Sequence, residues 1–123
     1  PQGKFYVALT LRHLSEIEFS KANYSKALEL QEVAAGYIAA TKGTHHLEYA
    51  QCLHNLGNIY YRKAELQKAE EYYTQALELR RARLLKETHP DVAQSIHSLA
   101  YLYTTQGFYD KAETFYSKAL QLT

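Results

Sequence analysis

The stretch AQCLHNLGNIY (residues 50–60), followed by AEEYYTQA (residues 69–76), decides the fold of this chain. The first part places Gly57 among large apolar residues, and the second part places Ala69 and Ala76 seven residues apart. Residues at this spacing lie on one face of a helix. Two antiparallel helices approach closely where small side chains on one helix meet large side chains on the other. The stretch therefore predicts a tightly packed helix pair.

The same pattern of small and large residues occurs twice more in the chain. Its other copies are AQSIHSLAYLY (residues 93–103) with AETFYSKA (residues 112–119), and ALTLRHLS (residues 8–15) with Ala27 and Ala34. The corresponding alanines Ala27, Ala69 and Ala112 are separated by 42 and then 43 residues. Periods of this size indicate a stacked array in which no unit buries its apolar face alone. Such arrays present extended surfaces, so the repeat favours a binding function.

The composition is that of a single domain with a buried core. Of the 123 residues, 46% are hydrophobic, and only 5 are Gly and 2 are Pro. No apolar run approaches the roughly 20 residues of a membrane span, and residues 1–16 lack the layout of a signal peptide. The net charge of +1 gives no general attraction to nucleic acid. Because Cys52 is the single cysteine, no intrachain disulfide is possible. We expect a cytoplasmic protein and a piece of a longer array.

Six helices are expected from the spacing of the apolar residues and from the turn signals between them. They cover about residues 5–19, 24–40, 47–62, 66–85, 91–105 and 109–123, grouped as units 5–43, 47–88 and 90–123 of one domain. Gly43 is predicted to end the second helix in a left-handed conformation. Thr88-His89-Pro90-Asp91 predicts a helix end followed by a new start, because proline suits the first turn of a helix.

The central copy resembles the tetratricopeptide repeat. The positions that carry this resemblance are Leu53, Leu56, Gly57, Tyr60, Ala69, Tyr73 and Ala76. The ordinary repeat has about 34 residues, whereas residues 78–85 extend the second helix here. A long unit with the loop THPDVA (residues 88–93) is similar to the kinesin light chain subgroup. HEAT repeats share the period of ~40–47 residues, but the recurring small residues Gly57, Ala69 and Ala76 argue against them.

The resemblance implies an all-α fold, in which three tandem antiparallel helix pairs stack as a right-handed superhelical tetratricopeptide array. In such arrays the first helices of the units line a concave groove, and the second helices form the convex back. On the groove side we expect these peptide-binding residues: Arg12, Glu16, Gln51, His54, Asn55, Asn58, Tyr61, Arg62, Gln94, His97, Ser98 and Tyr101. Their amides can pair with the backbone of an extended peptide, and their aromatic rings add contact area. A merely solvated inner face is the alternative.

The resemblance also bears on individual groove positions. Asn55 occupies the position at which the kinesin light chain subgroup has an asparagine that contacts the peptide main chain, and Ser98 and His13 replace it in the flanking units. Other adaptors of this fold clamp a C-terminal carboxylate with basic and amide residues. Such a clamp is not expected here, because Glu16 stands at one of its amide positions and Gln94 at one of its basic positions.

The histidines allow a metal site and a pH effect to be considered. His54 and His97 occupy equivalent positions on neighbouring first helices. Helix packing separates them by about 10 Å, too far for one zinc ion with bonds of ~2.0–2.1 Å. His45 and His46 have only Glu48 nearby, so no metal is expected. Below the ordinary histidine pKa of about 6.5, His54 and His97 should gain charge, so an acidic peptide should bind more tightly as the pH falls.

Catalysis and cofactors are not expected. The chain has no glycine-rich phosphate loop, no HExxH sequence and no nucleophile motif. Cys52 falls beside the core face and is expected to be a small buried hydrophobe. A basic cluster ends the fourth helix: Arg80, Arg81, Arg83 and Lys86. Because cations favour a helix C-terminus, a capping and solubility role is expected first, and a site for an acidic partner second.

The function expected from these observations is a protein–protein interaction module, an adaptor or scaffold that binds an extended peptide segment of a partner. Neither nucleic acid nor a membrane is expected as a partner. The alternative is a structural role, in which the array self-associates or serves as a rigid spacer within a larger protein. That alternative would rely on the apolar end of the sixth helix: Phe115, Leu120 and Leu122.

Overall fold

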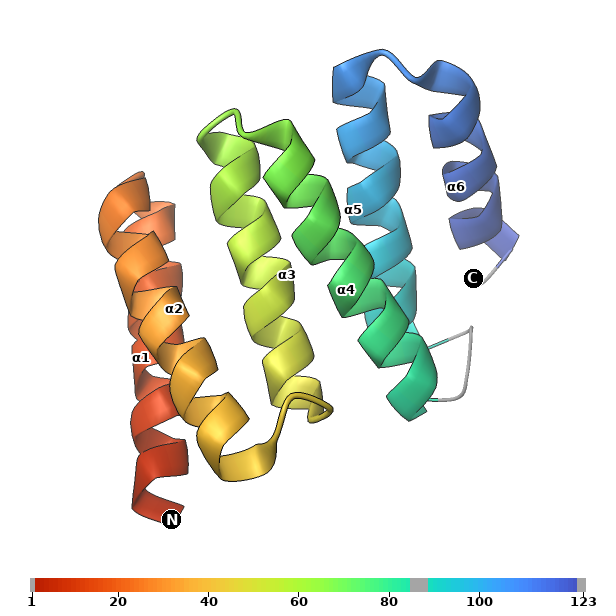
Figure 1. Ribbon diagram of the computed structural model, residues 1–123. Helices are drawn as coiled ribbons and strands as arrows, with labels where there is room; N and C mark the ends of the chain where they lie inside the picture. The colour runs from red at the N-terminus through yellow and green to blue at the C-terminus, as the bar shows by residue number, and fades with distance from the viewer. Residues whose placement is uncertain (1, 85–88, 122–123) are drawn as a thin grey trace.

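Three antiparallel helix pairs lie side by side in the computed structural model (Figure 1). The structure describes residues 2–84 and 89–121. The helices are α1 (Gln2–Ser20), α2 (Tyr24–Lys42), α3 (Leu47–Arg62), α4 (Leu66–Leu84), α5 (Pro90–Gln106) and α6 (Tyr109–Gln121). No strand occurs within the described ranges, and each helix packs on its neighbours in the chain. The expected all-α array of three helix pairs is confirmed.

The helices extend beyond the predicted bounds at several ends. α1 begins at Gln2 rather than near residue 5, and α2 ends at Lys42 rather than near residue 40. α5 begins at Pro90, one residue before the predicted start near residue 91, and Pro90 lies in the first turn as the sequence predicts. The helix end predicted at residues 85–88 lies outside the described residues.

Histidine side chains cap two of the first helices. His46 precedes α3, and its Nδ1 accepts a hydrogen bond from the backbone N–H of Glu48 at 3.0 Å. His89 occupies the equivalent position before α5, and its Nδ1 accepts from the N–H of Asp91 at 3.1 Å. The first amides of a helix have no partner within it. The imidazoles therefore take the place of the Ser, Thr, Asp or Asn that usually caps a helix.

The corner between the two helices of each unit contains a residue with positive φ. These residues are Ala22 (φ 65°), Ala64 (φ 64°) and Gly107 (φ 84°), at equivalent positions of the three units. Only glycine enters this region without steric cost, so the alanines strain the first two corners. Gly43, after α2, also has positive φ (88°), but its ψ of 165° is extended rather than left-handed helical. The prediction for the end of α2 was therefore wrong in conformation.

Gly57 marks a close approach of α3 and α4, as the pattern of small residues predicts. A Cβ atom at Gly57 would lie 2.6 Å from Cδ1 of Tyr73, well inside van der Waals contact. Tyr60 and Tyr73 are buried, and Tyr60 stacks on Tyr72 with ring centroids 5.5 Å apart. The missing side chain of Gly57 therefore admits a tyrosine ring between the two helices.

The second helix of each unit packs on the first helix of the next unit, and we call this contact a seam. The residues at the two seams differ. At the seam of α2 and α3, the buried Ile38 belongs to an apolar cluster with Cys52. At the seam of α4 and α5, the equivalent residues are Arg80 and Ser95, both buried, and Arg80 donates a hydrogen bond to Ser95 Oγ at 2.9 Å. The same place in the fold is thus apolar at one seam and polar at the other.

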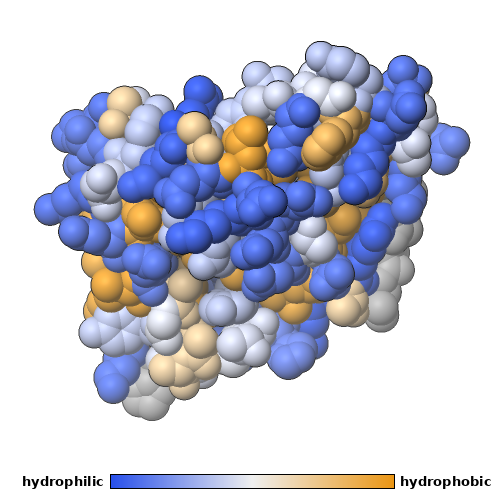
Figure 2. Space-filling model, turned by 45° about the horizontal axis from the view of Figure 1, so that its top comes forward, coloured by the Kyte–Doolittle hydropathy of each residue, from blue (hydrophilic) through white to orange (hydrophobic). Residues whose placement is uncertain are grey.

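The backs of the second helices are hydrophilic. Their exposed residues include Glu29 and Glu32 of α2, and Lys68 and Glu71 of α4. Figure 2 shows a face of the molecule on which hydrophilic side chains predominate and apolar residues emerge between them. Because such a back offers mostly solvated charge, the face of the first helices is the more promising place for a site.

Candidate peptide-binding groove

The first helices α1, α3 and α5 border two hollows that adjoin each other. The larger hollow, about 420 Å³, is lined by Phe19, Asn58, Tyr61, Arg62, Tyr73, His97, Ser98 and Tyr101. The smaller hollow, about 150 Å³, is lined by Ser15, Glu16, Phe19, Ser20, Gln31, Asn55 and Asn58. Because Phe19 and Asn58 line both hollows, the two form one depression across α1, α3 and α5. We call it the inner groove.

Eight of the twelve residues expected at the site line the inner groove. They are Glu16, Asn55, Asn58, Tyr61, Arg62, His97, Ser98 and Tyr101. The residues that do not line it are Arg12, Gln51, His54 and Gln94. Tyr73 and Gln31 line it although they come from second helices and were not predicted. Gln31 and Tyr73 occupy equivalent positions of their units, and Tyr73 lies against Gly57. The small residue on the first helix was therefore the available signal.

The larger hollow combines aromatic rings with the side-chain amide of Asn58, whose N–H donors are available to a ligand. The rings of Tyr61 and Tyr101 lie 5.6 Å apart, and the Tyr61 hydroxyl shares a hydrogen bond of 2.8 Å with Thr105 Oγ1. The Tyr73 hydroxyl donates to Asn58 Oδ1 at 2.6 Å. Among the described residues, Nδ2 of Asn58 has no hydrogen-bond partner, so its two N–H groups remain for a ligand or solvent.

A chain of hydrogen bonds continues from the groove into the interior. Gln51 Nε2 donates to Asn55 Oδ1 at 3.0 Å, and Asn55 Nδ2 donates to Glu16 Oε2 at 2.9 Å. At one end Arg80 donates to Gln51 Oε1 at 3.0 Å, and at the other Arg12 donates to Glu16 Oε2 at 2.8 Å. We call these five residues the polar chain. It connects α4, α3 and α1, and so links the units through side chains.

The polar chain changes the interpretation of Asn55. Only 8% of Asn55 is exposed, and its Nδ2 also lies 3.3 Å from Gln31 Oε1. The carbonyl and the amide of this side chain thus already have partners inside the protein. Asn55 therefore holds its neighbours in place, and the half-buried Asn58 is the open amide of the central unit.

Arg80 is not part of a surface cluster, contrary to the prediction. It is buried, and its guanidinium also donates to Gln94 Oε1 at 3.1 Å and to the backbone oxygen of Asp91 at 3.2 Å. Burial lowers the pKa of Arg80, while the charge of Asp91 opposes that shift. The planar guanidinium can serve several fixed acceptors at once. Of the other predicted members, Arg83 is exposed, and Lys86 lies outside the described residues.

His54 is buried, so it was wrongly expected to respond to mild acid. It is only 4% exposed and packs against Tyr73 with ring centroids 5.5 Å apart. Burial, with a smaller contribution from the charge of Arg80, lowers the pKa of His54 to about 4. His54 therefore stays neutral at pH 6. His97 differs from His54 in being exposed at the groove.

Among the described residues, Cys52 is not placed as a reactive thiol. Cys52 is fully buried, as predicted, and burial raises the pKa of its thiol to about 12, so the nucleophilic thiolate is disfavoured. In residues 2–84 and 89–121, no group of three or more His, Cys, Asp or Glu side chains is placed to hold a metal ion. Over the same residues, no helix is both long and apolar enough to cross a membrane.

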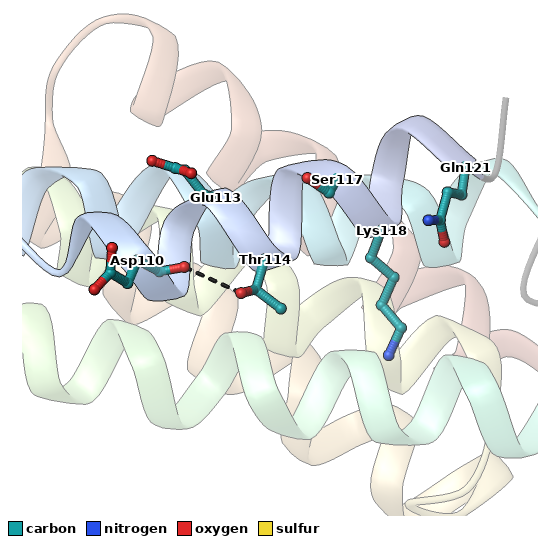
Figure 3. A pocket seen from close by; sticks show the side chains of 6 residues that line it. All are labelled: Asp110, Glu113, Thr114, Ser117, Lys118 and Gln121. Atoms are coloured by element: carbon teal, nitrogen blue, oxygen red, sulfur yellow. Dashed lines mark hydrogen bonds between the residues drawn. The ribbon is translucent and has the colours of Figure 1, made fainter.

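Two hollows on the outer side do not form comparable sites. One of about 650 Å³ follows α6 and is lined by Asp110, Glu113, Thr114, Ser117, Lys118 and Gln121 (Figure 3). A similar one of about 550 Å³ follows α4 and is lined by Gln67, Glu70, Glu71, Thr74 and Gln75. The one hydrogen bond drawn in Figure 3, from Thr114 Oγ1 to the backbone oxygen of Asp110, stays within the helix. Each hollow is lined by polar side chains of a single helix, so we regard both as shallow outer strips.

The repeat period and the packing of the helix pairs agree with those of a known protein family. The tetratricopeptide repeat family matches residues 6–82 and again residues 92–123. The chain belongs to the tetratricopeptide repeat family. Repeats of this family generally mediate protein–protein interactions and typically form non-enzymatic scaffolds.

Solved structures with this fold come from longer chains. BtubC (BKLC) from P. vanneervenii superposes with a TM-score of 0.87 at 26% identity, over 94% of this chain and 45% of that chain. A Podosopora anserina protein assigned to the kinesin light chains, with nearly identical TPR-like repeats, gives a TM-score of 0.80. That match has 23% identity over 92% of this chain and 53% of that one, so it concerns the fold alone.

One curated protein shares a short segment with the chain. A nucleotide-binding leucine-rich repeat (NLR)-like protein of Hyaloscypha variabilis is 51% identical over 39 residues, which are 32% of this chain and 4% of that protein. The chain thus spans about half of the solved relatives and a small part of the curated one.

Proposed function

We propose that this chain binds an extended peptide segment of a partner protein in the inner groove and acts as an adaptor or scaffold module. The observation that supports this most strongly is the continuity of the two hollows at Phe19 and Asn58. With neighbouring first helices about 10 Å apart, the groove is about 20 Å across. An extended segment of about six residues, at ~3.3 Å per residue, would cross it.

The open side chains of the larger hollow define the proposed contacts. The N–H groups of Asn58 and the hydroxyl of Ser98 would pair with the peptide backbone. The rings of Tyr61 and Tyr101 would pack on its side chains, since tyrosine gives contact area at low entropic cost. Arg62 is exposed at the same hollow and favours an acidic side chain in the peptide.

The test begins with peptides selected from a random-sequence display library on the wild-type protein. We expect Asn58→Ala to weaken binding of the selected peptides by about 5- to 150-fold, because a desolvated hydrogen-bond partner contributes ~1–3 kcal/mol. Arg62→Gln should weaken acidic peptides selectively, and added salt should reduce that difference. Fluorescence anisotropy with labelled peptides measures both effects.

Matched controls come from the outer backs of α4 and α6. Gln75→Ala and Lys118→Ala change exposed residues there and should leave the affinity unchanged. Glu70 is unsuitable as a control, because it accepts a hydrogen bond from the Tyr103 hydroxyl at 2.9 Å. If the selected peptides respond to the outer changes and ignore Asn58, the inner groove is not the binding surface.

A further inference from the structure

The two hollows of the inner groove occupy equivalent places in successive units. Six of the seven residues that line the smaller hollow have an equivalent, one repeat further along the chain, that lines the larger hollow. Three of these pairs are Glu16 with Asn58, Ser20 with Arg62, and Gln31 with Tyr73. The fold therefore builds one kind of hollow twice, first between α1 and α3 and again between α3 and α5. The side chains decide what each hollow can hold.

The equivalent residues differ in charge. The larger hollow has Arg62, and none of its described lining residues is acidic. In the smaller hollow Ser20 replaces that arginine, and Glu16 replaces Asn58. The smaller hollow thus has a carboxylate, and none of its described lining residues is Lys or Arg. An acidic side chain suits the larger hollow, as proposed above, but a different kind of side chain must suit the smaller one.

The hydroxyl hydrogens at the smaller hollow already have acceptors. Ser15 Oγ donates to the backbone oxygen of Ala27 at 2.7 Å, and Ser20 Oγ donates to the backbone oxygen of Glu16 at 3.1 Å. Each hydroxyl keeps lone pairs that can accept, and a carboxylate can only accept. The hollow therefore offers acceptors on three side chains, together with the free N–H groups of Asn58.

A neutral carboxamide is the side-chain group that matches this arrangement. Its NH₂ can donate to the acceptors, and its carbonyl can accept from Asn58. A carboxylate has no hydrogen to donate, and an apolar group would leave the acceptors desolvated without a partner. An ammonium group would donate, but the charge of Glu16 is already paired with Arg12 at 2.8 Å. A hollow of about 150 Å³ has room for a short side chain.

We propose that the smaller hollow is a subsite for a glutamine or asparagine side chain of the bound peptide, and that Glu16 excludes acidic side chains from it. This inference rests on the proposed function. The larger hollow then receives an acidic side chain of the same peptide. Because neighbouring first helices lie about 10 Å apart, the two side chains are separated by about two to four residues of extended chain.

Peptides selected on the wild-type protein test the subsite. Each glutamine or asparagine of a selected peptide is replaced in turn by the acid of the same shape. At one position, this change should weaken binding to the wild type at least about tenfold. Leucine at that position should weaken binding by about 5- to 150-fold, because the hydrogen bonds are lost. Fluorescence anisotropy measures each affinity.

Two variants of the protein test the role of the residues at the subsite. In Glu16→Gln the acidic peptide should lose less than about threefold, because the new amide can donate to a carboxylate. Ser20→Arg copies Arg62 into the smaller hollow, and the acidic peptide should then bind at least as tightly as the original. The matched controls are Glu18→Gln, on the same helix, and Thr114→Arg, whose hydroxyl also bonds within its own helix on the outer side. Both should keep the wild-type preference.

The outcomes separate this inference from the proposed function. Selected peptides that ignore Asn58→Ala overturn both. Peptides that need Asn58 but bind equally well with the amide and with the acid overturn the subsite alone, and so does a preference that survives in both Glu16→Gln and Ser20→Arg. Circular dichroism checks that the variants remain helical. If Glu16→Gln unfolds, Ser20→Arg decides the question, because Ser20 is exposed and lies outside the polar chain.

Discussion

At the scale of single residues, Gly36 and Gly57 both lie within helices but have opposite surroundings. A Cβ at Gly36 of α2 would meet no atom within 4 Å, whereas one at Gly57 of α3 would lie 2.6 Å from the ring of Tyr73. The hydroxyl of Tyr73 is bonded to Asn58, and its ring is buried, so the ring has little freedom to move aside. The same substitution should therefore have opposite effects at the two positions.

We expect Gly57→Ala to lower the free energy of unfolding by about 1–3 kcal/mol, because overpacking displaces the Tyr73 ring. Gly36→Ala is the matched control and should raise that free energy by about 0.5–1 kcal/mol, since alanine is favoured over glycine within a helix. Urea denaturation of the three proteins measures both differences. A neutral Gly57→Ala would mean that α3 and α4 separate at little cost.

The burial of His54 leads to a second prediction, which concerns the free energy of unfolding at low pH. Its pKa is about 4 in the folded chain, below the ordinary value of about 6.5 expected when unfolded. Above pH 6.5 the imidazole is neutral in both states. Between pH 6.5 and 4 only the unfolded state binds the proton, so stability falls as the pH falls, by up to about 3 kcal/mol at pH 4. His54→Gln should reduce this loss, whereas His97→Gln, at an exposed position, should not. Equal acid sensitivity of wild type and His54→Gln would contradict the prediction.

At the scale of helices, Arg80 of the polar chain holds α4 against α3 and α5. One guanidinium nitrogen of Arg80 reaches Gln51, and the other reaches Gln94, Ser95 and the backbone of Asp91. A lysine would keep the charge but has a single nitrogen, which cannot occupy both places. We expect Arg80→Lys to lower the free energy of unfolding by about 1–3 kcal/mol, because buried acceptors lose their partner.

Thermal and urea unfolding measure the effect of Arg80→Lys, and Arg83→Lys is its control because Arg83 is exposed on the same helix. The control should change stability very little. If both variants unfold like the wild type, the two guanidinium nitrogens of Arg80 do not hold the helices together.

The sequence predicted the helix pairs but not the interior of the groove, for a physical reason. Small residues such as Gly57 and Ala69 allow two helices to approach closely wherever they recur. Their period alone therefore predicts how the helices pair. Arg80 and Asn55 are different, because their burial depends on partners from other helices. Arg80 stands where the first unit has Ile38, and it is satisfied by residues of α3 and α5. A repeat pattern shows which positions are equivalent, but it does not show which polar side chains pair across a seam.

At the scale of the whole molecule, burial is distributed unevenly along the stack. In α3, nine of its 16 residues are buried, whereas in α6 only Ala112 is buried. Opening of a segment costs less where few apolar contacts are lost. We therefore expect the backbone amides of α6 to exchange with solvent faster than those of α3 by native-state hydrogen exchange. Uniform protection of both helices would instead mean that the array opens only as a whole.

The unlike seams also give the units an order. Ile38 meets Cys52 at the first seam, whereas Arg80 meets Ser95 at the second. If the first unit were duplicated into the place of the second, an apolar side chain would face Ser95 and Gln94, and their hydrogen-bonding groups would lose the guanidinium. In the reverse exchange, a buried guanidinium would face Cys52. The units are therefore not interchangeable modules, although their backbones repeat. Recombination within such a gene would be tolerated only where the two helices that meet at a seam are exchanged together. The conserved unit of exchange is therefore the pair of helices at a seam rather than the helix pair of one repeat.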